Sequence, residues 1–437
     1  MQKLAFLLVS LTMVISSMRA VNIEELRLLK IPVMVVETVN GEMPTCDFIE
    51  APSGCDGLTS TNQNKVPARM LLVLGPDTLY DSGEYLKDVS GLTIRIRGNT
   101  SGYVRPMKPY KLKLQKKADL LSRGDDRFKD KNWVLMNYYY YNPIIANKIL
   151  DLLDFGWHPE CEFVNLILND DYQGLYILSE SIKRNADCRV NVSKNDGFLF
   201  ENDPYWWNDS VYADASAIDN KYKFTFKYPD PEDISEDQVK FISSLMNDVE
   251  SSILDGTYPQ RIDVNSFAKW LLLHDIIGTY DSGGSNMYLS LYDSLSKVRM
   301  VSPWDFDSSL NPENKSSWAR IHEDRIFYFP YLLSNANTLF LEEYSHIWNT
   351  KKNDIFSEMS QFLSIIKESD IAKDITISRR LTLDRWYETD DERYSSYKVE
   401  DEIDKLKNWF DERKTWLDEN VVEFNSGAYE ITHSPEQ

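Results

Sequence analysis

Residues 280–307 read YDSGGSNMYLSLYDSLSKVRMVSPWDFD, and this stretch carries the most informative pattern in the chain. Asp281 stands five residues before Asn286. A short apolar run, a turn and a second short run then lead to Asp305 and Asp307. Carboxylate and amide oxygens are the hard ligands that Mg²⁺ and related cations prefer. The stretch therefore predicts a divalent-cation site beside a carboxylate that is free of metal.

The order Asp-x4-Asn, with a further Asp after the next pair of strands, is typical of protein kinases. In such enzymes one carboxylate orients the attacking hydroxyl, and bound cations neutralise the phosphates of the nucleotide. We therefore interpret Asp281 as the catalytic carboxylate, and Asn286 and Asp305 as metal ligands. Asp307 is a second metal ligand or a support for Asp305, since alternation along a strand would put both on one face.

Other interpretations of these residues exist. Asp281 precedes a Gly-Gly pair, which is also good turn chemistry, and Asn286 would then hold the loop by a hydrogen bond. The residues from Asp305 onward also begin like a calcium-binding loop. Position six of such a loop would be Leu310 rather than Gly, and position twelve Ser316 rather than Glu. The calcium loop is therefore excluded.

The N-terminus and the net charge predict an exported, acidic protein. Residues 1–20 have a positive start and an apolar core of about a dozen residues, which is too short to span a bilayer, so they predict a cleaved signal peptide. No other run of 18 or more apolar residues predicts a membrane span. Cleavage would lower the formal charge of −21 by two, to −23, because Lys3 and Arg19 are lost. Such a surface repels nucleic acid. A charge that serves only solubility is the preferred interpretation, and a basic or Ser/Thr-rich protein is the partner that would complement the charge. We expect a secreted, periplasmic or cell-surface location.

Four cysteines follow the predicted signal peptide. An even number in an exported chain suggests disulfide bonds, and four cysteines allow three pairings. The pairs nearest in sequence, Cys46–Cys55 and Cys161–Cys188, are the pairings that we expect. Their spacings do not fit a zinc site.

Short apolar or alternating runs predict strands at 30–36, 69–74, 92–97, 109–114, 132–136, 163–168 and 174–178. Helices are predicted at 143–155, after caps at Ser235 and Asp263, and at 337–367 and 398–422. Sheet in the first half and helices in the second predict an α+β fold. We expect a sheet-rich lobe at 21–180, a mainly helical lobe at 181–430 and a tail at 431–437, with a ligand cleft between the lobes.

Four segments resemble the CotH (spore coat protein H) kinase family, in the family's order, over about residues 90–310. They are RIRGNTS (95–101) with KPYKLKL (108–114), NLILNDDYQGLYILSESIKR (165–184), SNMYLSLYD (285–293) and SPWDFDSSL (302–310). The resemblance implies an atypical, two-lobed protein-kinase-like fold. It also implies use of ATP with Mg²⁺ or Mn²⁺, and phosphorylation of Ser or Thr in a protein acceptor, often outside the cytoplasm.

The resemblance extends to nucleotide-binding residues. Kinases hold the phosphates with one strand lysine, and Lys113 is preferred here over Lys111, although both also fit a solvated basic face. A phosphate-side turn would be formed by small and polar residues, namely Arg97, Gly98, Asn99 and Ser101; a plain hairpin is the alternative. Glu180 is expected near the nucleotide, or else in a surface ion pair. Asp151 is the best-placed helix acid to pair with the lysine.

Two further functional classes fit the same sequence. Family members often carry an Asn two places before the catalytic Asp, whereas this chain has Thr279-Tyr280 before Asp281. That departure and the many aromatic residues are compatible with a non-catalytic pseudokinase, or with a surface protein that binds carbohydrate or protein as an adhesin does. A kinase-like fold can also transfer AMP or an amino acid instead of phosphate.

Overall fold

The computed structural model describes residues 21–218, 222–281, 285–322, 327–334, 337–388 and 390–422. The predicted signal peptide at 1–20 and the tail at 431–437 lie outside these residues. In the described part of the chain, no helix is both long and apolar enough to cross a membrane.

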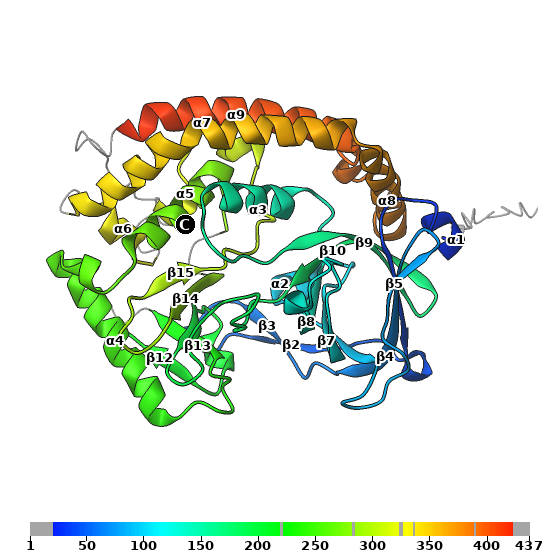
Figure 1. The fold of residues 1–437 in the computed structure, drawn as a ribbon, viewed down its shortest axis with the longest axis horizontal. Helices are drawn as coiled ribbons and strands as arrows, with labels where there is room; N and C mark the ends of the chain where they lie inside the picture. The colour runs from blue at the N-terminus through cyan, green and yellow to red at the C-terminus, as the bar shows by residue number, and fades with distance from the viewer. Residues whose placement is uncertain are drawn as a thin grey trace, which may run out of the picture.

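Seven strands of the N-terminal half close into a barrel (Figure 1). Around the ring they are β1 (Val33–Thr38), β9 (Cys161–Leu168), β10 (Asp171–Glu180), β8 (Asp130–Met136), β7 (Tyr110–Ala118), β6 (Leu92–Ile96) and β4 (Val66–Leu74). The ring closes because β1 pairs with β4 on one side and with β9 on the other. An eighth strand, β5 (Asp77–Asp81), pairs with the end of β4. All seven strands predicted from the sequence are confirmed, but the sheet that they form is closed.

Alternation along these strands separates an apolar barrel core from a polar outer face. On β6 and β7, Leu92, Ile94, Leu112 and Leu114 are almost fully buried in the barrel core. Residues that alternate with these on the same strands, including Arg95 and Lys111, point the other way. The outer face of β6 and β7 is therefore available to carry charged side chains.

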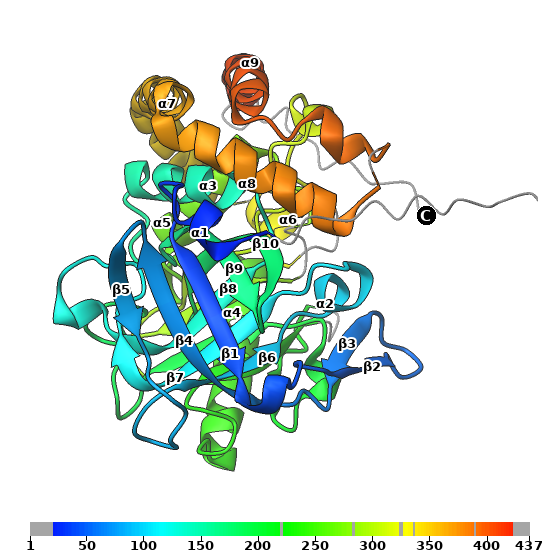
Figure 2. The ribbon, with the colours of Figure 1, turned by 90° about the vertical axis from the view of Figure 1, so that its right-hand side faces the viewer.

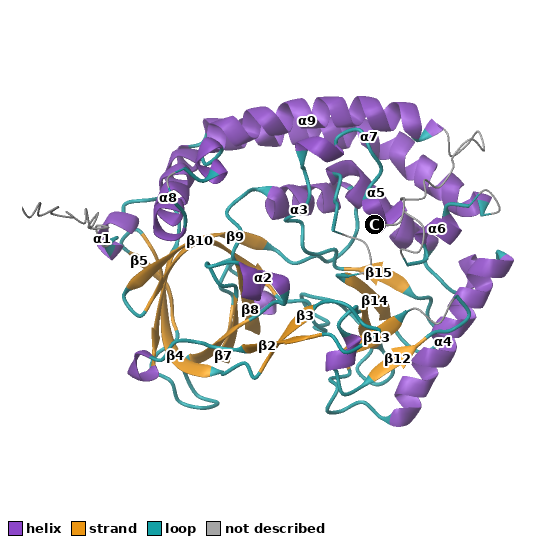
Figure 3. Cartoon of the chain, turned by 180° about the vertical axis from the view of Figure 1, so that it is seen from behind, coloured by secondary structure: helices purple, strands orange, loops and turns teal. Residues whose placement is uncertain are grey.

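A two-stranded hairpin, β2 (Asp47–Glu50) and β3 (Leu58–Thr61), stands beside the barrel (Figure 3). Cys46 precedes β2 and Cys55 lies in the turn after it, so an extended strand of four residues, about 13 Å long, separates them. A disulfide needs Cα atoms within about 7 Å. All four cysteines are free thiols in this structure, so both predicted disulfides, Cys46–Cys55 and Cys161–Cys188, are wrong.

A second sheet lies in the part of the chain that was expected to be mainly helical. Its strand order is β12 (Tyr212–Asp214), β13 (Lys223–Tyr228), β11 (Phe198–Asn202), β14 (Met287–Leu291) and β15 (Arg299–Val301). Only the last two strands were expected from the sequence. The strand β11 lies at the centre of the sheet because it pairs antiparallel with both β13 and β14.

Helices cover the second sheet and arch over the barrel (Figures 1 and 2). They are α3 (Asn142–Leu152), α4 (Glu236–Asp255), α5 (Val264–Ile277), α7 (Thr338–Glu368), α8 (Asp370–Trp386) and α9 (Val399–Asn420), with short helices α1 (Ile23–Leu26), α2 (Thr100–Val104) and α6 (Phe329–Leu332). The predicted caps are confirmed: Ser235 forms a capping box on α4, and Asp263 caps α5. The helix α8 was not expected.

The core has two main parts. One fills the barrel, and a larger one joins the second sheet to α3, α4, α5, α7 and α9. The molecule is thus a mixed α and β protein in which a barrel adjoins a helix-covered sheet. This arrangement brings the outer face of β6 and β7 opposite the second sheet.

Candidate active site

A cavity of about 660 Å³ lies between the barrel, α2 and the second sheet. Nine of the sequence-predicted site residues line it: Arg97, Gly98, Asn99, Ser101, Lys111, Asp281, Asn286, Asp305 and Asp307. They come from segments as far apart as β6 and the loop after β15. The structure therefore brings most of the predicted residues to one place.

Asn286 and Asp305 form the centre of the acidic wall. The Asn286 Nδ2 donates a hydrogen bond to Asp305 Oδ2 at 3.2 Å, and the Tyr138 hydroxyl donates to Asp305 Oδ1. Asn286 and Asp305 have φ angles of 58° and 65°. Asn and Asp are the non-glycine residues that adopt left-handed backbone most readily. The two proposed metal ligands share this conformation at the point where their side chains meet.

Asp307 lies beside this pair. Its side chain is 28% exposed and pairs with Arg105 at 3.2 Å. Burial, followed by the nearby Asp305 carboxylate, raises the pKa of Asp307 to about 7. Residues 302–307 are not a strand, and Asp305 has positive φ, so strand alternation is not what puts the two carboxylates together. Crowded carboxylates of this kind are stabilised by a bound cation.

Asp281 follows directly from α5. Gly278, with φ of 56°, ends that helix, and the chain then turns toward the cavity. The Asp281 backbone N–H donates to Ser308 Oγ at 2.8 Å. This bond ties the proposed catalytic residue to the loop that carries Asp305 and Asp307. The Asp281 side chain is exposed at the cavity and accessible to an incoming group.

The barrel wall of the cavity is cationic. Lys111 on β7 lies opposite Arg95 on β6 in the strand register, and both line the cavity with Arg97. Burial, and then the charges of Arg95 and Arg97, lower the pKa of Lys111 to about 8. Neither Lys111 nor Arg95 has a hydrogen-bond or ion-pair partner among the residues that the structure describes. Partly buried cations without counter-ions are suited to an anionic ligand.

The predicted phosphate-side turn lies at the start of α2. Gly98 has φ of 84°, and a Cβ there would meet Ser101 Oγ at 2.6 Å, so this position requires glycine. The Asn99 Oδ1 accepts a hydrogen bond from Thr59 on β3 at 2.8 Å. Asn99 and Ser101 therefore line the cavity from a turn that the β2–β3 hairpin supports.

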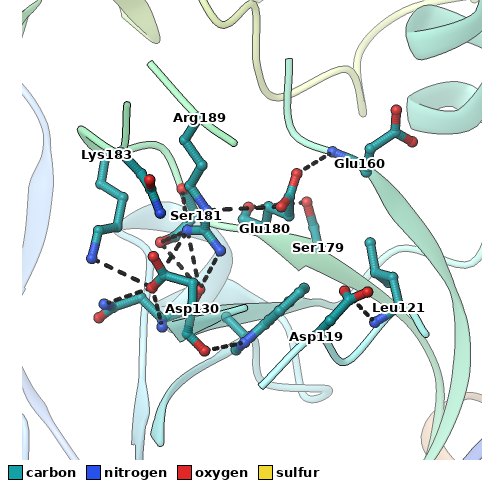
Figure 4. A network of polar contacts seen from close by, with 12 residues as sticks. Asp119, Leu121, Asp130, Glu160, Ser179, Glu180, Ser181, Lys183 and Arg189 are labelled. Carbon is teal, nitrogen blue, oxygen red and sulfur yellow. Dashed lines mark hydrogen bonds and ion pairs between the residues drawn. The ribbon is translucent and has the colours of Figure 1, made fainter. Parts of the chain in front are cut away.

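Two predicted residues do not line this cavity. Lys113 is exposed and lies opposite Asn132, two residues along β7 from Lys111. Glu180 is fully buried and pairs with Arg123 at 2.9 Å and Arg189 at 3.8 Å. Figure 4 shows Glu180 within this network at the end of β10. The geometry thus favours Lys111 over Lys113, and it gives Glu180 a buried ion pair.

Sequence reasoning missed three residues of the site. Tyr138, the first of four consecutive tyrosines at 138–141, contacts Asp305. Lys227 on β13 and Glu201 on β11 form a partly buried ion pair at 3.0 Å within the cavity. They lie on strands that the sequence analysis did not identify. The expected helix acid, Asp151, instead contacts His158 at 3.1 Å and does not line the cavity.

The donor set fits a metal-bound nucleotide. Within the described ranges, no cluster of three or more His, Cys, Asp or Glu side chains has metal-holding geometry. The set in the cavity consists instead of two carboxylates and an amide, which leaves positions for phosphate oxygens and water, as Mg²⁺ requires. The cations on the barrel wall lie on the other side of the same cavity.

Comparison with known proteins places the chain. No curated protein matches it. Among solved structures it is similar to the Helicobacter pylori proinflammatory kinase CtkA, with 11% identity over 88% of this chain and 97% of that chain, and a TM-score of 0.31. It is also similar to a chain of the Shewanella oneidensis MR-1 HipA–HipB toxin–antitoxin complex with operator DNA, with 11% identity over 68% and 61% and a TM-score of 0.25. Scores of this size carry no argument.

The comparison with protein families is decisive. The family described as CotH kinase protein matches residues 94–417, which is most of the chain. The matched range includes both walls of the cavity, from β6 to α9. The resemblance noted from four short segments is therefore confirmed over a much longer stretch. The chain belongs to the CotH kinase protein family.

Proposed function

We propose that this protein is a metal-dependent atypical kinase that transfers the γ-phosphate of ATP to a Ser or Thr hydroxyl of a protein acceptor. One observation carries the proposal: a carboxylate–amide set and cations without a counter-ion among the described residues face the same cavity. The cations suit phosphate oxygens, and the carboxylates suit Mg²⁺ or Mn²⁺. The barrel would act as one lobe of a two-lobed kinase, and the helix-covered sheet as the other.

The cavity residues divide into two groups. Lys111, Arg95 and Arg97 would hold the phosphates from the barrel side. Asn286 and Asp305 would hold the metal, with Asp307 as a second ligand once Arg105 is displaced toward a phosphate. A bound divalent metal supplies charge neutralisation on the transferring phosphoryl group.

Asp281 would act on the acceptor. Its carboxylate is exposed and is held near the metal loop through Ser308. Such a carboxylate can accept a hydrogen bond from an acceptor hydroxyl and take its proton as the bond to phosphorus forms. Asp281 therefore has an orienting role, separate from the metal-binding role of Asp305.

The acceptor and the location are part of the proposal. The charge of −21 favours a basic acceptor over an acidic one. Export rests on the signal-like residues 1–20. N-terminal sequencing of the mature protein tests it, and an N-terminus that retains residues 1–20 would contradict it.

The experiment compares two labelled nucleotides. The purified protein is incubated with Mn²⁺ and either γ-labelled or α-labelled ATP, with and without a basic acceptor protein. The proposal predicts transfer from γ-labelled ATP only, and loss of transfer in Asp281→Ala and Asp305→Ala. Transfer from α-labelled ATP would indicate AMP transfer. No transfer from either, with binding of ATP retained, would indicate a pseudokinase.

A further inference from the structure

Arg413 on α9 is a buried cation with unusual partners. Its side chain is fully buried, and its nitrogens donate to backbone carbonyls of Asp275, Asn314, Lys315 and Ser317. The bonds to Asp275 from Nε and to Ser317 from Nη1 measure 2.7 and 2.6 Å. A guanidinium has five donors in a rigid fork, so a single side chain can hold several carbonyls in one arrangement.

The four carbonyls belong to two segments that flank the proposed active centre. Asp275 lies on the last turns of α5, six residues before Asp281. The segment 314–317 follows the loop that carries Asp305 and Asp307. Arg413 therefore joins the chain just before the proposed catalytic residue to the chain just after the proposed metal ligands.

Trp409, one turn earlier on α9, reinforces the same junction. Its Nε1 donates to the Asn311 carbonyl at 3.0 Å. Its ring also lies against Gly278, where a Cβ would approach the ring to 3.0 Å. Gly278 is the residue that ends α5 with positive φ. The close packing of Trp409 thus leaves little room for a side chain at the point where the chain turns toward Asp281.

The two flanking segments also bond directly to each other. The Leu310 N–H donates to the Ile277 carbonyl at 2.8 Å, and Asn314 Nδ2 donates to the Gly278 carbonyl at 3.3 Å. The buried Asp275 carboxylate accepts from His322 Nε2 at 2.8 Å. The segments form one unit, and α9 closes it on the side away from the cavity.

We propose that α9 is a positioning element of the active centre, in which Arg413 and Trp409 set the separation between Asp281 and the Asn286–Asp305 pair. The proposal rests on the proposed function for its consequence in catalysis. A mutation far from the reacting atoms can lower a rate by about a hundred-fold if it misplaces a catalytic group by about 1 Å. Loss of the Arg413 fork should therefore affect metal binding and turnover beyond its effect on stability.

The test uses variants of the full chain. Arg413→Lys keeps the charge but loses the fork, and Trp409→Phe keeps the ring but loses the bond to Asn311. Leu417→Ala is the matched control: Leu417 is fully buried on the same helix and contributes packing without bonding to either segment. Three quantities are measured: Tm, Mn²⁺ affinity by electron paramagnetic resonance, and hydrogen exchange of peptides covering 276–281 and 305–312.

The expected result distinguishes a role in positioning the active centre from a role in the stability of the fold. Arg413→Lys and Trp409→Phe should speed exchange in both peptides and weaken Mn²⁺ binding by about ten-fold or more, whereas Leu417→Ala should lower Tm with Mn²⁺ affinity nearly unchanged. The inference would be overturned if Leu417→Ala weakened Mn²⁺ binding as much as the other two variants do. It would also be overturned if hydrogen exchange were unchanged in both Arg413→Lys and Trp409→Phe. Failure of the wild-type protein to transfer phosphate would contradict the proposed function alone, because the exchange measurement is independent of activity.

Discussion

The side-chain nitrogen of Asn286 lies 3.2 Å from the Asp305 carboxylate, and both residues have left-handed backbone. Nineteen residues and two strands separate them in the chain. The hydrogen bond joins two segments that are distant in the chain, so the surrounding fold brings both side chains together. This contact is the centre of the proposed metal site.

Replacing Asp305 should remove metal binding. Asp305→Ala deletes the carboxylate that two neighbouring side chains orient, so Mn²⁺ affinity should fall by at least about a hundred-fold. Titration followed by electron paramagnetic resonance measures the Mn²⁺ affinity. Asp293→Ala is the control, because Asp293 lies in the turn after β14 and does not line the cavity. Unchanged Mn²⁺ affinity in Asp305→Ala would contradict the assignment.

Lys111 and Lys113 should differ in their contribution to ATP affinity. Lys111→Met removes a partly buried cation that faces the cavity, and a charged hydrogen bond is worth about 1.5–3 kcal/mol. ATP affinity should therefore fall by about 10- to 100-fold. Lys113→Met, two residues along the same strand, should leave ATP affinity within about two-fold, since its charge is exposed to solvent. Equilibrium binding of ATP measures both, and a larger effect of Lys113→Met would favour the original expectation from sequence.

The lowered pKa of Lys111 predicts that both stability and ATP binding change with pH. Its pKa is lowered to about 8 in the folded protein, from 10.5 in an unfolded chain. The unfolded state therefore binds more protons between these values, so stability rises as pH increases from about 8 toward 10.5. ATP binding needs the protonated amine and should weaken in the wild type above pH 8. In Lys111→Met both effects should be absent, and denaturant unfolding and ATP titration at pH 7, 8 and 9 measure them.

Tyr138 should tune the metal site without being a ligand. Tyr138→Phe removes the hydroxyl that donates to Asp305, and loss of such outer partners typically costs about 10- to 100-fold in metal affinity. Tyr140→Phe, in the same run of tyrosines, should leave Mn²⁺ affinity unchanged because Tyr140 does not line the cavity. Equal Mn²⁺ affinities in the two variants would exclude a role for the hydroxyl.

Glu180 should contribute more to the stability of the fold than to nucleotide binding. Glu180→Gln removes the buried carboxylate that pairs with Arg123 and Arg189. Asp130 remains 3.9 Å from Arg189, so the cost should be at most the roughly 3–5 kcal/mol of breaking a buried pair. The free energy of unfolding in urea should fall accordingly. ATP affinity, measured at a temperature where the variant is folded, should change by less than about two-fold. A large loss of ATP affinity at unchanged stability would restore the nucleotide role expected from sequence.

Much of the local structure follows from the sequence. Alternation at 92–97 and 109–114 predicts β6 and β7, and the caps Ser235 and Asp263 predict where α4 and α5 begin. These features depend on residues close in the chain, where propensity and periodicity act directly. Asp281 could be placed because it follows α5 by a short turn.

The remaining features depend on partners that are distant in the chain. Alternation puts Lys111 and Lys113 on one face but cannot say which of them lies under the cavity, because that depends on the position of the second sheet. Glu201 and Lys227 meet only through the antiparallel pairing of β11 with β13. Barrel closure likewise depends on β1 pairing with two distant strands.

The most direct test of the central claim measures ATP binding and phosphate transfer together, with and without Mn²⁺, in the wild type, Asp281→Asn and Asp305→Asn. We expect Asp281→Asn to bind Mn²⁺ and ATP as the wild type does but to transfer no phosphate. In Asp305→Asn, ATP binding should no longer depend on Mn²⁺. ATP binding by the wild type that is absent, or that is unaffected by Mn²⁺, would contradict the account.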